Sequence, residues 1–358
     1  MMKFRHTRLL SLALILILAI GMFAGCGKTE EPAAEPETNT AEVPTELMVS
    51  LNVGTLKGPT GMGMIGFFGR EDELFYVNLY DAPDQIMAAL ISQELDVAAV
   101  PSNVAAALYK KTEGGVKLVG VNTGGVLYLV SNNVDPIADL TDLKGKTVYA
   151  AGQGGVPEYA FTALMQNAGL EEGDVDVQWV ASHADAVSEI AAKGGYALIP
   201  EPQVTACKSK AENASVDINL NECWKEAYGY DLAMGVIVAR KEVAEQRTAD
   251  VEYFISQYQA SLEGIAADKD AACEKIAEVG IVPAAPIAKA AMSRCNIMLV
   301  TDKEAVKGII EELYGTLLEL NPASIGGAMP ADDFYFANTA DLEALGLNYT
   351  TVLNDLMK

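Results

Sequence analysis

Histidine is nearly absent from this chain of 358 residues, which contains only two, His6 and His183. The sequence also has no GxSxG, HExxH or Walker A pattern. His183 has no serine or cysteine motif with which to form a catalytic pair, so we expect it to be structural or exposed. We therefore predict a protein that is not an enzyme and that has no catalytic residue, no metal site and no cofactor.

Cysteine is also scarce. Apart from Cys26, the chain has Cys207, Cys223, Cys273 and Cys295, with no CxxC and no histidine at zinc-binding spacing. Cys207 and Cys223 are able to form a disulfide only in an oxidising compartment, and an export signal alone does not establish one. Cys273 lies in a helical pattern, AACEKIAEVG, and is expected to be a small buried hydrophobic residue.

Basic residues are few, with 25 Lys and Arg against 49 Asp and Glu, which gives a formal net charge of −24. Removal of residues 1–25 would take away three bases and no acids, leaving the chain near −27. So much negative charge argues against binding to nucleic acid and against broad contact with anionic lipid.

The N-terminus has the three parts of a secretory signal. Lys3, Arg5 and Arg8 precede an apolar run over residues 9–23, and small residues lead to Cys26. The run is short for a bilayer span of roughly 20 residues. Ala24-Gly25-Cys26 resembles the lipobox of bacterial lipoproteins, in which the cysteine is lipidated, although phenylalanine stands at position 23 where leucine is usual. The alternative is an uncleaved anchor with an incidental cysteine.

Residues 26–46 are rich in Glu, Pro, Ala and Thr and have almost no large apolar side chains. Such a segment buries too little surface to offset its conformational entropy, so we expect a disordered tether. The sequence thus predicts a signal peptide over 1–25, a tether over 26–46 and a body over 47–358 that is held outside the cytoplasm on the bacterial cell membrane by a lipid anchor.

The body is long enough for two domains. Strand-like and helix-like runs alternate up to about residue 240, which indicates an α/β fold with largely parallel sheets. After that point every pattern is helical, so we expect no further strands. We predict one lobe over 47–130 together with 238–358, and a second over 131–237. The expected strands are 47–53, 74–80, 96–100, 117–121, 126–131, 147–151, 175–180, 196–199 and 234–239, and the expected helices between them include 83–94, 158–169, 184–194 and 204–213.

The loop after the first expected strand has the sequence KGPTGMGMIG, residues 57–66. Its Gly61-x-Gly63-x-x-Gly66 spacing matches a dinucleotide fingerprint, but residues 54–60 separate it from the strand, where the fingerprint requires a direct turn. A helix that starts at Pro59 would contain these glycines and Gly69, each at a cost of about 1 kcal/mol relative to alanine. Close approach of a ligand or of another part of the chain would explain them, and a plain packing helix is the alternative.

Four more polar segments follow expected strands. They are Pro101-Ser102-Asn103, residues 122–125, residues 151–158, and a Glu201 that lies between two prolines. Ser102 or Asn103 is equally suited to capping the next helix. Because α/β sheets bind ligands at the carboxyl ends of their strands, these segments favour a cleft between two domains.

The chain resembles the solute-binding proteins of ABC importers, in the branch that includes nitrate, sulfonate, taurine and thiamine-precursor binders. The resemblance rests on the lipobox and tether, on the GPTG loop, and on three segments: APDQIMAALISQELDVAAVPSN, LTDLKGKTVYAAGQGGVPEYAFTALMQNAGL and ALIPEPQVT. It implies a type II periplasmic-binding-protein fold, in which two α/β lobes are joined by two crossing strands and close over a ligand. The crossings would fall near 126–131 and 231–238.

The resemblance also implies the ligand-binding residues and the partners. The partners would be a small-molecule solute, an ABC permease and its ATPase, and the protein would be a monomer. No arginine occurs in the loops concerned, so no clamp on an anion is evident. Met62, Met64, Phe67 and Tyr128 are expected to form an apolar or aromatic wall, which favours a polar heterocycle or a metabolite of mixed polarity. The implied ligand-binding residues are Lys57, Gly58, Pro59, Thr60, Gly61, Met62, Gly63, Ser102, Asn103, Asn122, Thr123, Gly124, Gln153, Gly154, Gly155, Val156 and Glu201.

Two other functions remain open. The first is an enzyme on the same fold, of the menaquinone-pathway or thiamine-pyrimidine type; the second of these needs an active-site histidine, for which the body offers only His183. The second is a lipoprotein that presents its ligand to a receptor instead of a permease.

Overall fold

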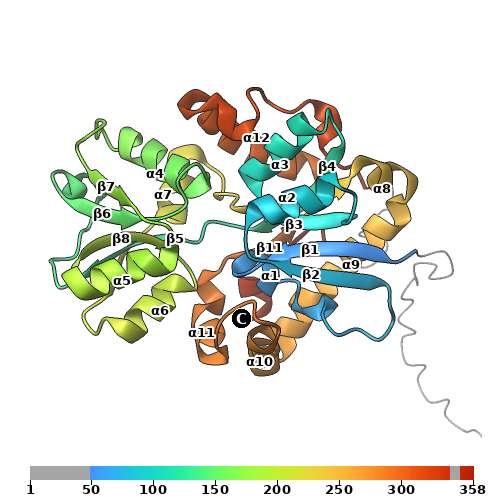
Figure 1. The fold of residues 1–358 in the computed structure, drawn as a ribbon, viewed down its shortest axis with the longest axis horizontal. Coiled ribbons are helices and arrows are strands. Elements are labelled where there is room, and N and C mark those ends of the chain that lie inside the picture. The colour runs from blue at the N-terminus through green and yellow to red at the C-terminus, as the bar shows by residue number, and fades with distance from the viewer. Residues whose placement is uncertain (1–48, 339–346) are drawn as a thin grey trace, which may run out of the picture. The chain divides into compact units, whose positions relative to one another are not determined.

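The computed structural model describes residues 49–338 and 347–358, which all belong to one compact unit. The expected signal peptide, Cys26 and the tether lie outside the described residues. Two sheets organise the chain, one of seven strands and one of five. Strands β5 to β9 form the five-stranded sheet, and helices α4 to α7 pack around it (Figure 1). The remaining elements belong to the seven-stranded sheet or surround it.

The strands largely follow the expected runs. In chain order they are β1 (Leu51–Leu56), β2 (Phe75–Tyr80), β3 (Val97–Pro101), β4 (Val116–Thr123), β5 (Leu127–Asn132), β6 (Thr147–Ala150), β7 (Asp176–Trp179), β8 (Gly195–Pro200), β9 (Ser215–Asn219), β10 (Gly235–Arg240), β11 (Ile297–Val300) and β12 (Thr350–Val352).

Helices cover the sheets. The α-helices are α1 (Pro59–Met62), α2 (Pro83–Ile91), α3 (Ser102–Lys111), α4 (Val156–Asn167), α5 (His183–Lys193), α6 (Gln203–Lys210), α7 (Leu220–Tyr228), α8 (Lys241–Gln246), α9 (Thr248–Ala267), α10 (Lys269–Val279), α11 (Ala285–Ala291), α12 (Lys303–Leu320) and α13 (Leu353–Leu356). Short 3₁₀ helices are η2 (Ile65–Phe67), η3 (Leu140–Leu143), η4 (Met292–Arg294), η5 (Pro322–Ile325) and η6 (Asp332–Phe334).

The seven-stranded sheet has the order β12-β11-β4-β10-β3-β1-β2. Strand β1 pairs in parallel with β2 and β3, whereas β10 runs antiparallel between β3 and β4. Strands β11 and β12 add two more antiparallel pairs. The expectation of largely parallel sheets is therefore wrong, because strands that return from the later part of the chain enter in the opposite direction.

The five-stranded sheet has the order β7-β6-β8-β5-β9, with β5 antiparallel to both of its neighbours. The chain passes from the first sheet to the second over residues 124–126 and returns over residues 229–234. Strand β5 thus lies in the second sheet and β10 in the first. The chain therefore crosses between the sheets a few residues before the expected lobe boundaries at 130/131 and 237/238.

The expectation that strands end at about residue 240 is wrong. Strand β11 joins the edge of β4, and β12 pairs with β11. Strand β9, which was not expected either, extends the second sheet. Each is only three to five residues long, so its alternation is too brief to stand out among helical patterns.

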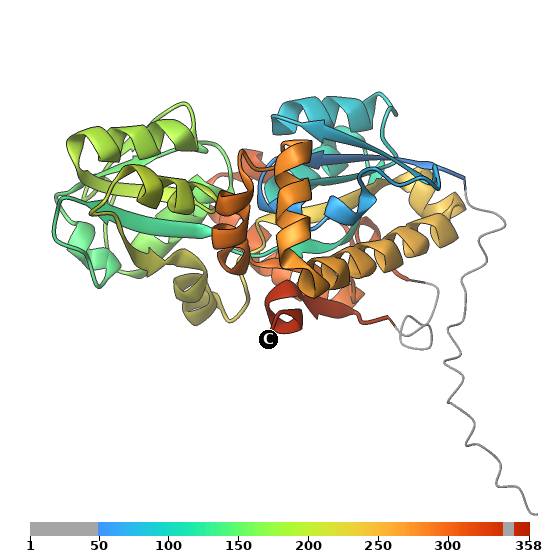
Figure 2. The same ribbon diagram turned by 90° about the horizontal axis from the view of Figure 1, so that it is seen from below.

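Alternating side chains of the strands form the cores on both faces of the sheets. Figure 2 shows the orange helices α9 to α11 gathered beside the seven-stranded sheet, and α11 contacts α6 of the second sheet. Cys273 is buried, as expected, and the four cysteines of the described residues, Cys207 and Cys223 included, are free thiols. Within the ranges described, no helix combines the length and apolar character needed to cross a bilayer.

Candidate functional site

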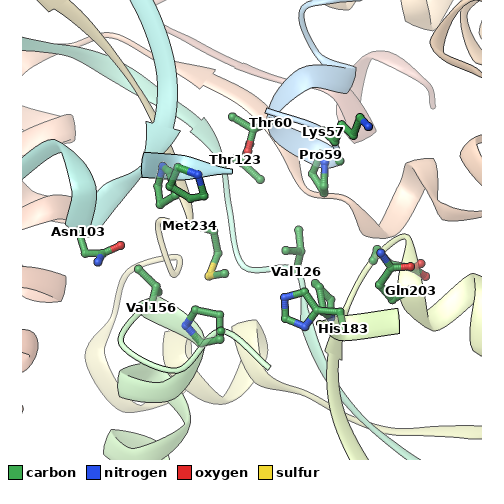
Figure 3. Close-up of a pocket in the computed structure, with 18 of the residues that line it drawn as sticks. Lys57, Pro59, Thr60, Asn103, Thr123, Val126, Val156, His183, Gln203 and Met234 are labelled. Carbon is green, nitrogen blue, oxygen red and sulfur yellow. The ribbon is translucent and has the colours of Figure 1, made fainter. Parts of the chain in front are cut away.

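A cavity of about 480 Å³ opens between loops that follow strands of both sheets. Residues 57–60 follow β1 and residues 101–104 surround the start of α3, whereas residues 152–157 follow β6 and residues 200–203 follow β8. In Figure 3, Lys57, Pro59 and Thr60 lie on one side of the cavity and Val156 and His183 on the other. The carboxyl ends of strands from two sheets thus meet at one pocket, which is the place where α/β proteins usually bind ligands.

The loop after β1 begins a helix at Pro59, as its sequence predicted. Pro59 occupies the first turn and Gly58 precedes it with φ 91°, a backbone conformation that favours glycine. Helix α1 has only four residues, however, and ends at Met62. The expectation that Gly63, Gly66 and Gly69 lie inside this helix is therefore wrong.

The glycines of this loop make room for the protein itself. A Cβ atom on Gly61 would collide with the carbonyl oxygen of Leu56, and one on Gly63 with the hydroxyl of Tyr258. A Cβ on Gly66 would come within 2.8 Å of Ser261. Gly61, Met62 and Gly63 are absent from the lining of the cavity, whereas Lys57 to Thr60 contribute to it.

Ser102 and Asn103 have different surroundings. Ser102 is fully buried, and its hydroxyl donates a 2.6 Å hydrogen bond to the carbonyl oxygen of Ala233. Asn103 lines the cavity and is 8% exposed. Neither side chain caps α3, whose N-cap residue is Pro101, so the capping interpretation is wrong.

Of the three expected binding residues at the end of β4 and just after it, only one lines the cavity. Asn122 is fully buried and donates to the carbonyl oxygen of Thr60 at 3.3 Å and to the Tyr258 hydroxyl at 3.4 Å, so it supports the β1 loop from behind. Thr123 lines the cavity. Gly124 donates its N–H to the carbonyl oxygen of Asn296 and does not line the cavity.

The loop after β6 places Gln153, Gly154, Gly155 and Val156 in the lining, as the resemblance implied. Gly154 has φ 79°, which only glycine adopts without strain. Gly155 is the N-cap of α4 and has no side chain with which to cap it. The start of this 12-residue helix, with its positive dipole end, therefore borders the cavity, although Pro157 has no N–H and the N–H of Glu158 donates to the carbonyl oxygen of Gly155.

Glu201 lines the cavity but faces a partner that was not expected. Arg294, from η4, donates its Nε–H to the carboxylate at 2.5 Å, and the Thr205 backbone N–H donates at 3.1 Å. The suggested opposite charge, Lys57, pairs instead with Asp81 at 2.5 Å. Arg294 lies 93 residues from Glu201, so no local pattern reveals the pair.

The four residues expected to form the apolar wall do not line the cavity. Met62, Met64 and Phe67 are buried in the core, and the Tyr128 hydroxyl donates to the carbonyl oxygen of Arg294. Helix η2 packs on α9, where the ring of Phe67 lies 4.9 Å from that of Phe254, and the sulfur of Met62 lies 3.8 Å from that of Cys295. The apolar lining consists of Val104, Val126, Val156, Met234 and the prolines Pro59, Pro83, Pro101, Pro157, Pro200 and Pro202.

His183 is a lining residue that the sequence reading missed. It is the first residue of α5, after the exit of β7, and its Nδ1 is buried with no hydrogen-bond partner within the described ranges. Burial lowers the pKa of His183 to about 4, so its imidazole is neutral at pH 7. Its position after a strand, next to the capping Ser182, is the same signal that marked the other loops. The residues described include no group of His, Cys, Asp and Glu able to hold a metal ion.

Known structures share this fold. A crystal structure of an ABC transporter protein from Parabacteroides distasonis has a TM-score of 0.69 at 23% identity and covers 80% of this chain and 98% of its own. The periplasmic aliphatic sulphonate binding protein SsuA of Escherichia coli has a TM-score of 0.64 at 16% identity and covers 76% and 87%. The alkanesulfonate-binding protein SsuA of Xanthomonas axonopodis, bound to MOPS, has a TM-score of 0.59 at 15% identity and covers 79% and 95%.

The fold is therefore that of the periplasmic binding proteins, in agreement with the expected α/β class. No curated protein matches the chain. The family model described as "NMT1/THI5 like" matches residues 80–272, more than half of the chain. These residues include the loops after β3, β6 and β8 that border the cavity. The chain belongs to the NMT1/THI5-like family.

Proposed function

We propose that this protein is an extracytoplasmic solute-binding lipoprotein of an ABC importer, which captures a small uncharged metabolite and delivers it to a permease. The observation that carries the proposal is the cavity of about 480 Å³, to which loops at the strand ends of both sheets contribute. Its volume suits a metabolite-sized ligand. Two of the solved neighbours are named as sulphonate-binding proteins, which supports a solute-binding role.

The charges around the cavity favour an uncharged ligand. Lys57 is the one Lys or Arg side chain among the described lining residues, and its ammonium group pairs with Asp81. Glu201 is paired with Arg294. The remaining polar side chains include the carboxamides of Asn103, Gln153 and Gln203, which each offer a donor and an acceptor. A polar heterocycle or another uncharged metabolite with an apolar body fits such a lining, whereas a small inorganic anion finds no free cation.

Binding would close the protein by a hinge. The segments over residues 124–126 and 229–234 are the two connections between the sheets, and rotation about them would open and close the cavity. We propose that the two α/β lobes are the units that move, with the first lobe containing both ends of the body.

The N-terminus would supply the anchor. We propose that residues 1–25 are a signal peptide, that Cys26 carries the lipid and that residues 26–46 tether a monomeric body to the outer face of the cell membrane. A Cys26→Ser variant should lose incorporation of labelled palmitate and leave the membrane fraction. Retention of both properties in that variant would contradict the lipid anchor.

A binding role is better supported than catalysis. His183 has no partner for Nδ1 within the described ranges, so no hydrogen bond to that nitrogen orients the imidazole as a general base. Incubation of the protein with the solute that it carries should leave that solute unchanged, as judged by mass spectrometry. Conversion of the solute would favour the alternative of an enzyme on this fold.

Mass spectrometry of small molecules that co-purify with the protein tests the function directly. The solute identified should bind with a Kd about three- to tenfold weaker in Asn103→Ala and in Gln153→Ala, since each variant removes one hydrogen-bonding group. Asn167→Ala, at the exposed end of α4 away from the cavity lining, is the matched control and should bind normally. Equal affinities in all three variants would exclude this cavity, and the absence of any bound or stabilising metabolite would contradict the function.

A further inference from the structure

The carboxylate of Glu201 is the most enclosed charge at the cavity. Its residue has 0% exposed surface although it belongs to the lining. One oxygen accepts from the Arg294 Nε–H at 2.5 Å and from the Thr205 hydroxyl at 3.1 Å, and the other accepts from the Thr205 backbone N–H at 3.1 Å. The carboxylate is therefore satisfied by the protein, with one full positive charge opposite it.

The pair joins the two sheets. Glu201 follows β8 and Thr205 lies in α6, both on the five-stranded sheet, whereas Arg294 ends η4 shortly before β11 of the seven-stranded sheet. A second nitrogen of Arg294, Nη2, donates a 2.9 Å hydrogen bond to the hydroxyl oxygen of Thr205. Tyr128 of β5 donates to the backbone oxygen of Arg294 at 3.1 Å. Arg294 is thus fixed through its side chain and its backbone by residues of the other sheet.

A guanidinium group so close to a binding cavity would ordinarily attract anions, because its planar fork matches carboxylate, phosphate and sulfonate groups. Here the guanidinium donates its Nε–H to Glu201, which lines the cavity, and an Nη–H to Thr205, and Arg294 itself is not a lining residue. Removal of Arg294 would leave the enclosed Glu201 carboxylate uncompensated, which is strongly unfavourable, whereas removal of Glu201 would leave a guanidinium group that is 37% exposed. A ligand that enters with its own charge next to this pair would have to disrupt it.

We propose that Glu201 is a specificity-determining residue, which acts as a built-in counter-ion for Arg294 and makes the cavity reject anionic ligands. Arg294 is the positioning residue that holds this carboxylate between the two sheets. This proposal rests on the proposed binding function. It concerns the charge preference of the cavity, which is testable without the natural solute.

Two single variants, Glu201→Gln and Arg294→Gln, shift the net charge of the pair in opposite directions. Glu201→Gln keeps the shape of the side chain and frees the guanidinium, so the purified protein should bind sulfate at least about tenfold more tightly than the wild type, by titration calorimetry at constant ionic strength. Adding Arg294→Gln to this variant should abolish the gain. Glu189→Gln is the matched control, since Glu189 forms an ion pair of the same 2.5 Å length with Lys193 on α5.

The single variant Arg294→Gln provides the opposite test and does not depend on the folding of Glu201→Gln. It leaves the carboxylate without its cation, so methylguanidinium at millimolar concentration should raise its melting temperature, relative to the same concentration of sodium chloride. The wild type and Glu189→Gln should show no such rise.

The outcomes separate the two proposals. A gain of sulfate binding in Glu201→Gln with no natural solute found would support the charge role and contradict the importer function. A natural solute found, together with unchanged sulfate affinity in folded Glu201→Gln and no methylguanidinium effect on Arg294→Gln, would overturn the charge role alone. Sulfate binding by the wild type as tight as by Glu201→Gln would overturn it as well.

Discussion

The side-chain amide of Asn321 donates a 2.9 Å hydrogen bond to the phenolic oxygen of Tyr159, which lies 162 residues earlier in the chain. Tyr159 belongs to α4 on the five-stranded sheet, and Asn321 links α12 to η5 beside the seven-stranded sheet. This contact is separate from those that Arg294 makes with Glu201 and Tyr128, and it also connects elements of the two sheets. The relative position of the sheets therefore depends on specific side chains as well as on the connecting segments.

Removal of the Tyr159 hydroxyl should abolish the hydrogen bond to Asn321. We expect Tyr159→Phe to lower the free energy of unfolding by about 0.5–1.5 kcal/mol, because the exposed Asn321 loses the hydrogen bond that it donates to the buried Tyr159. Urea denaturation followed by circular dichroism measures the change. Tyr76→Phe, at a position that is 49% exposed, is the control and should be nearly neutral. Equal stabilities of the two variants would show that the bond contributes nothing.

The glycines of the β1 loop offer a test of their role. A methyl group at Gly63 would collide with Tyr258 and approach Ile297 within 2.8 Å, so Gly63→Ala should destabilise the protein by about 1–3 kcal/mol. Gly264 lies within α9 with nothing within 4 Å of an added Cβ. Gly264→Ala should stabilise by about 1 kcal/mol, as expected for a helical site. Thermal unfolding compares the two, and a stable Gly63→Ala protein would refute the packing explanation.

His183 should make stability depend on pH in a defined window. Its folded pKa of about 4 lies below the usual value of 6.5, so the unfolded chain binds the proton first as the pH falls. The contribution of the neutral imidazole is complete above pH 6.5 and is lost between pH 6.5 and 4. We expect the difference in unfolding free energy between wild type and His183→Gln to shrink by an amount on the order of 3 kcal/mol across that window.

The pKa is also accessible directly, because His183 is the only histidine after residue 25. A single imidazole resonance in a ¹⁵N-correlated NMR titration should remain neutral down to about pH 4–5. Titration of that resonance near pH 6.5 would contradict the burial of His183.

Asp96 should be among the most sensitive charged residues. Its carboxylate is 5% exposed and accepts from Arg240 at 2.7 Å and from the backbone N–H of Asn52 at 2.9 Å. Asp96→Ala leaves the arginine and the amide without their acceptor, so we expect a loss of about 3–5 kcal/mol in chemical denaturation. Asp355→Ala, which removes an exposed pair with Lys358, should cost less than about 1 kcal/mol. Similar losses in both would show that burial is not the cause.

Local patterns were sufficient for much of the fold. Runs such as VLYLVS, and prolines such as Pro59 and Pro157, mark a strand or the start of a helix within a few residues, because the information is contained in the segment itself. Strand β11 was missed for the opposite reason. Its four residues become a strand only through pairing with β4, which lies about 170 residues earlier.

The same distinction applies to the site. Lys57 to Thr60 and Gln153 to Val156 follow strands, and their place at the cavity could be anticipated from that position alone. Met62 and Phe67 belong to the same loop, yet their orientation depends on packing against distant parts of the chain, Cys295 for Met62 and α9 for Phe67, which no local pattern encodes. Arg294 was missed because its position beside Glu201 depends on how η4 and α11 pack against α6.

The strand order of the seven-stranded sheet has a consequence for the order in which parts of the protein fold. The neighbours of β4 are β10 and β11, so this sheet is incomplete until residues near 300 have emerged, whereas the last strand of the other sheet ends at Asn219. We expect chains arrested near residue 240 to protect amides of β5 to β9 from hydrogen exchange while β4 remains open on one side. Protection of β4 before that of β5 would refute this order. The five-stranded sheet, in the middle of the chain, would thus be completed first. Strands β1 to β4 would stay in an incomplete sheet, accessible to chaperones, until the last quarter of the chain is available.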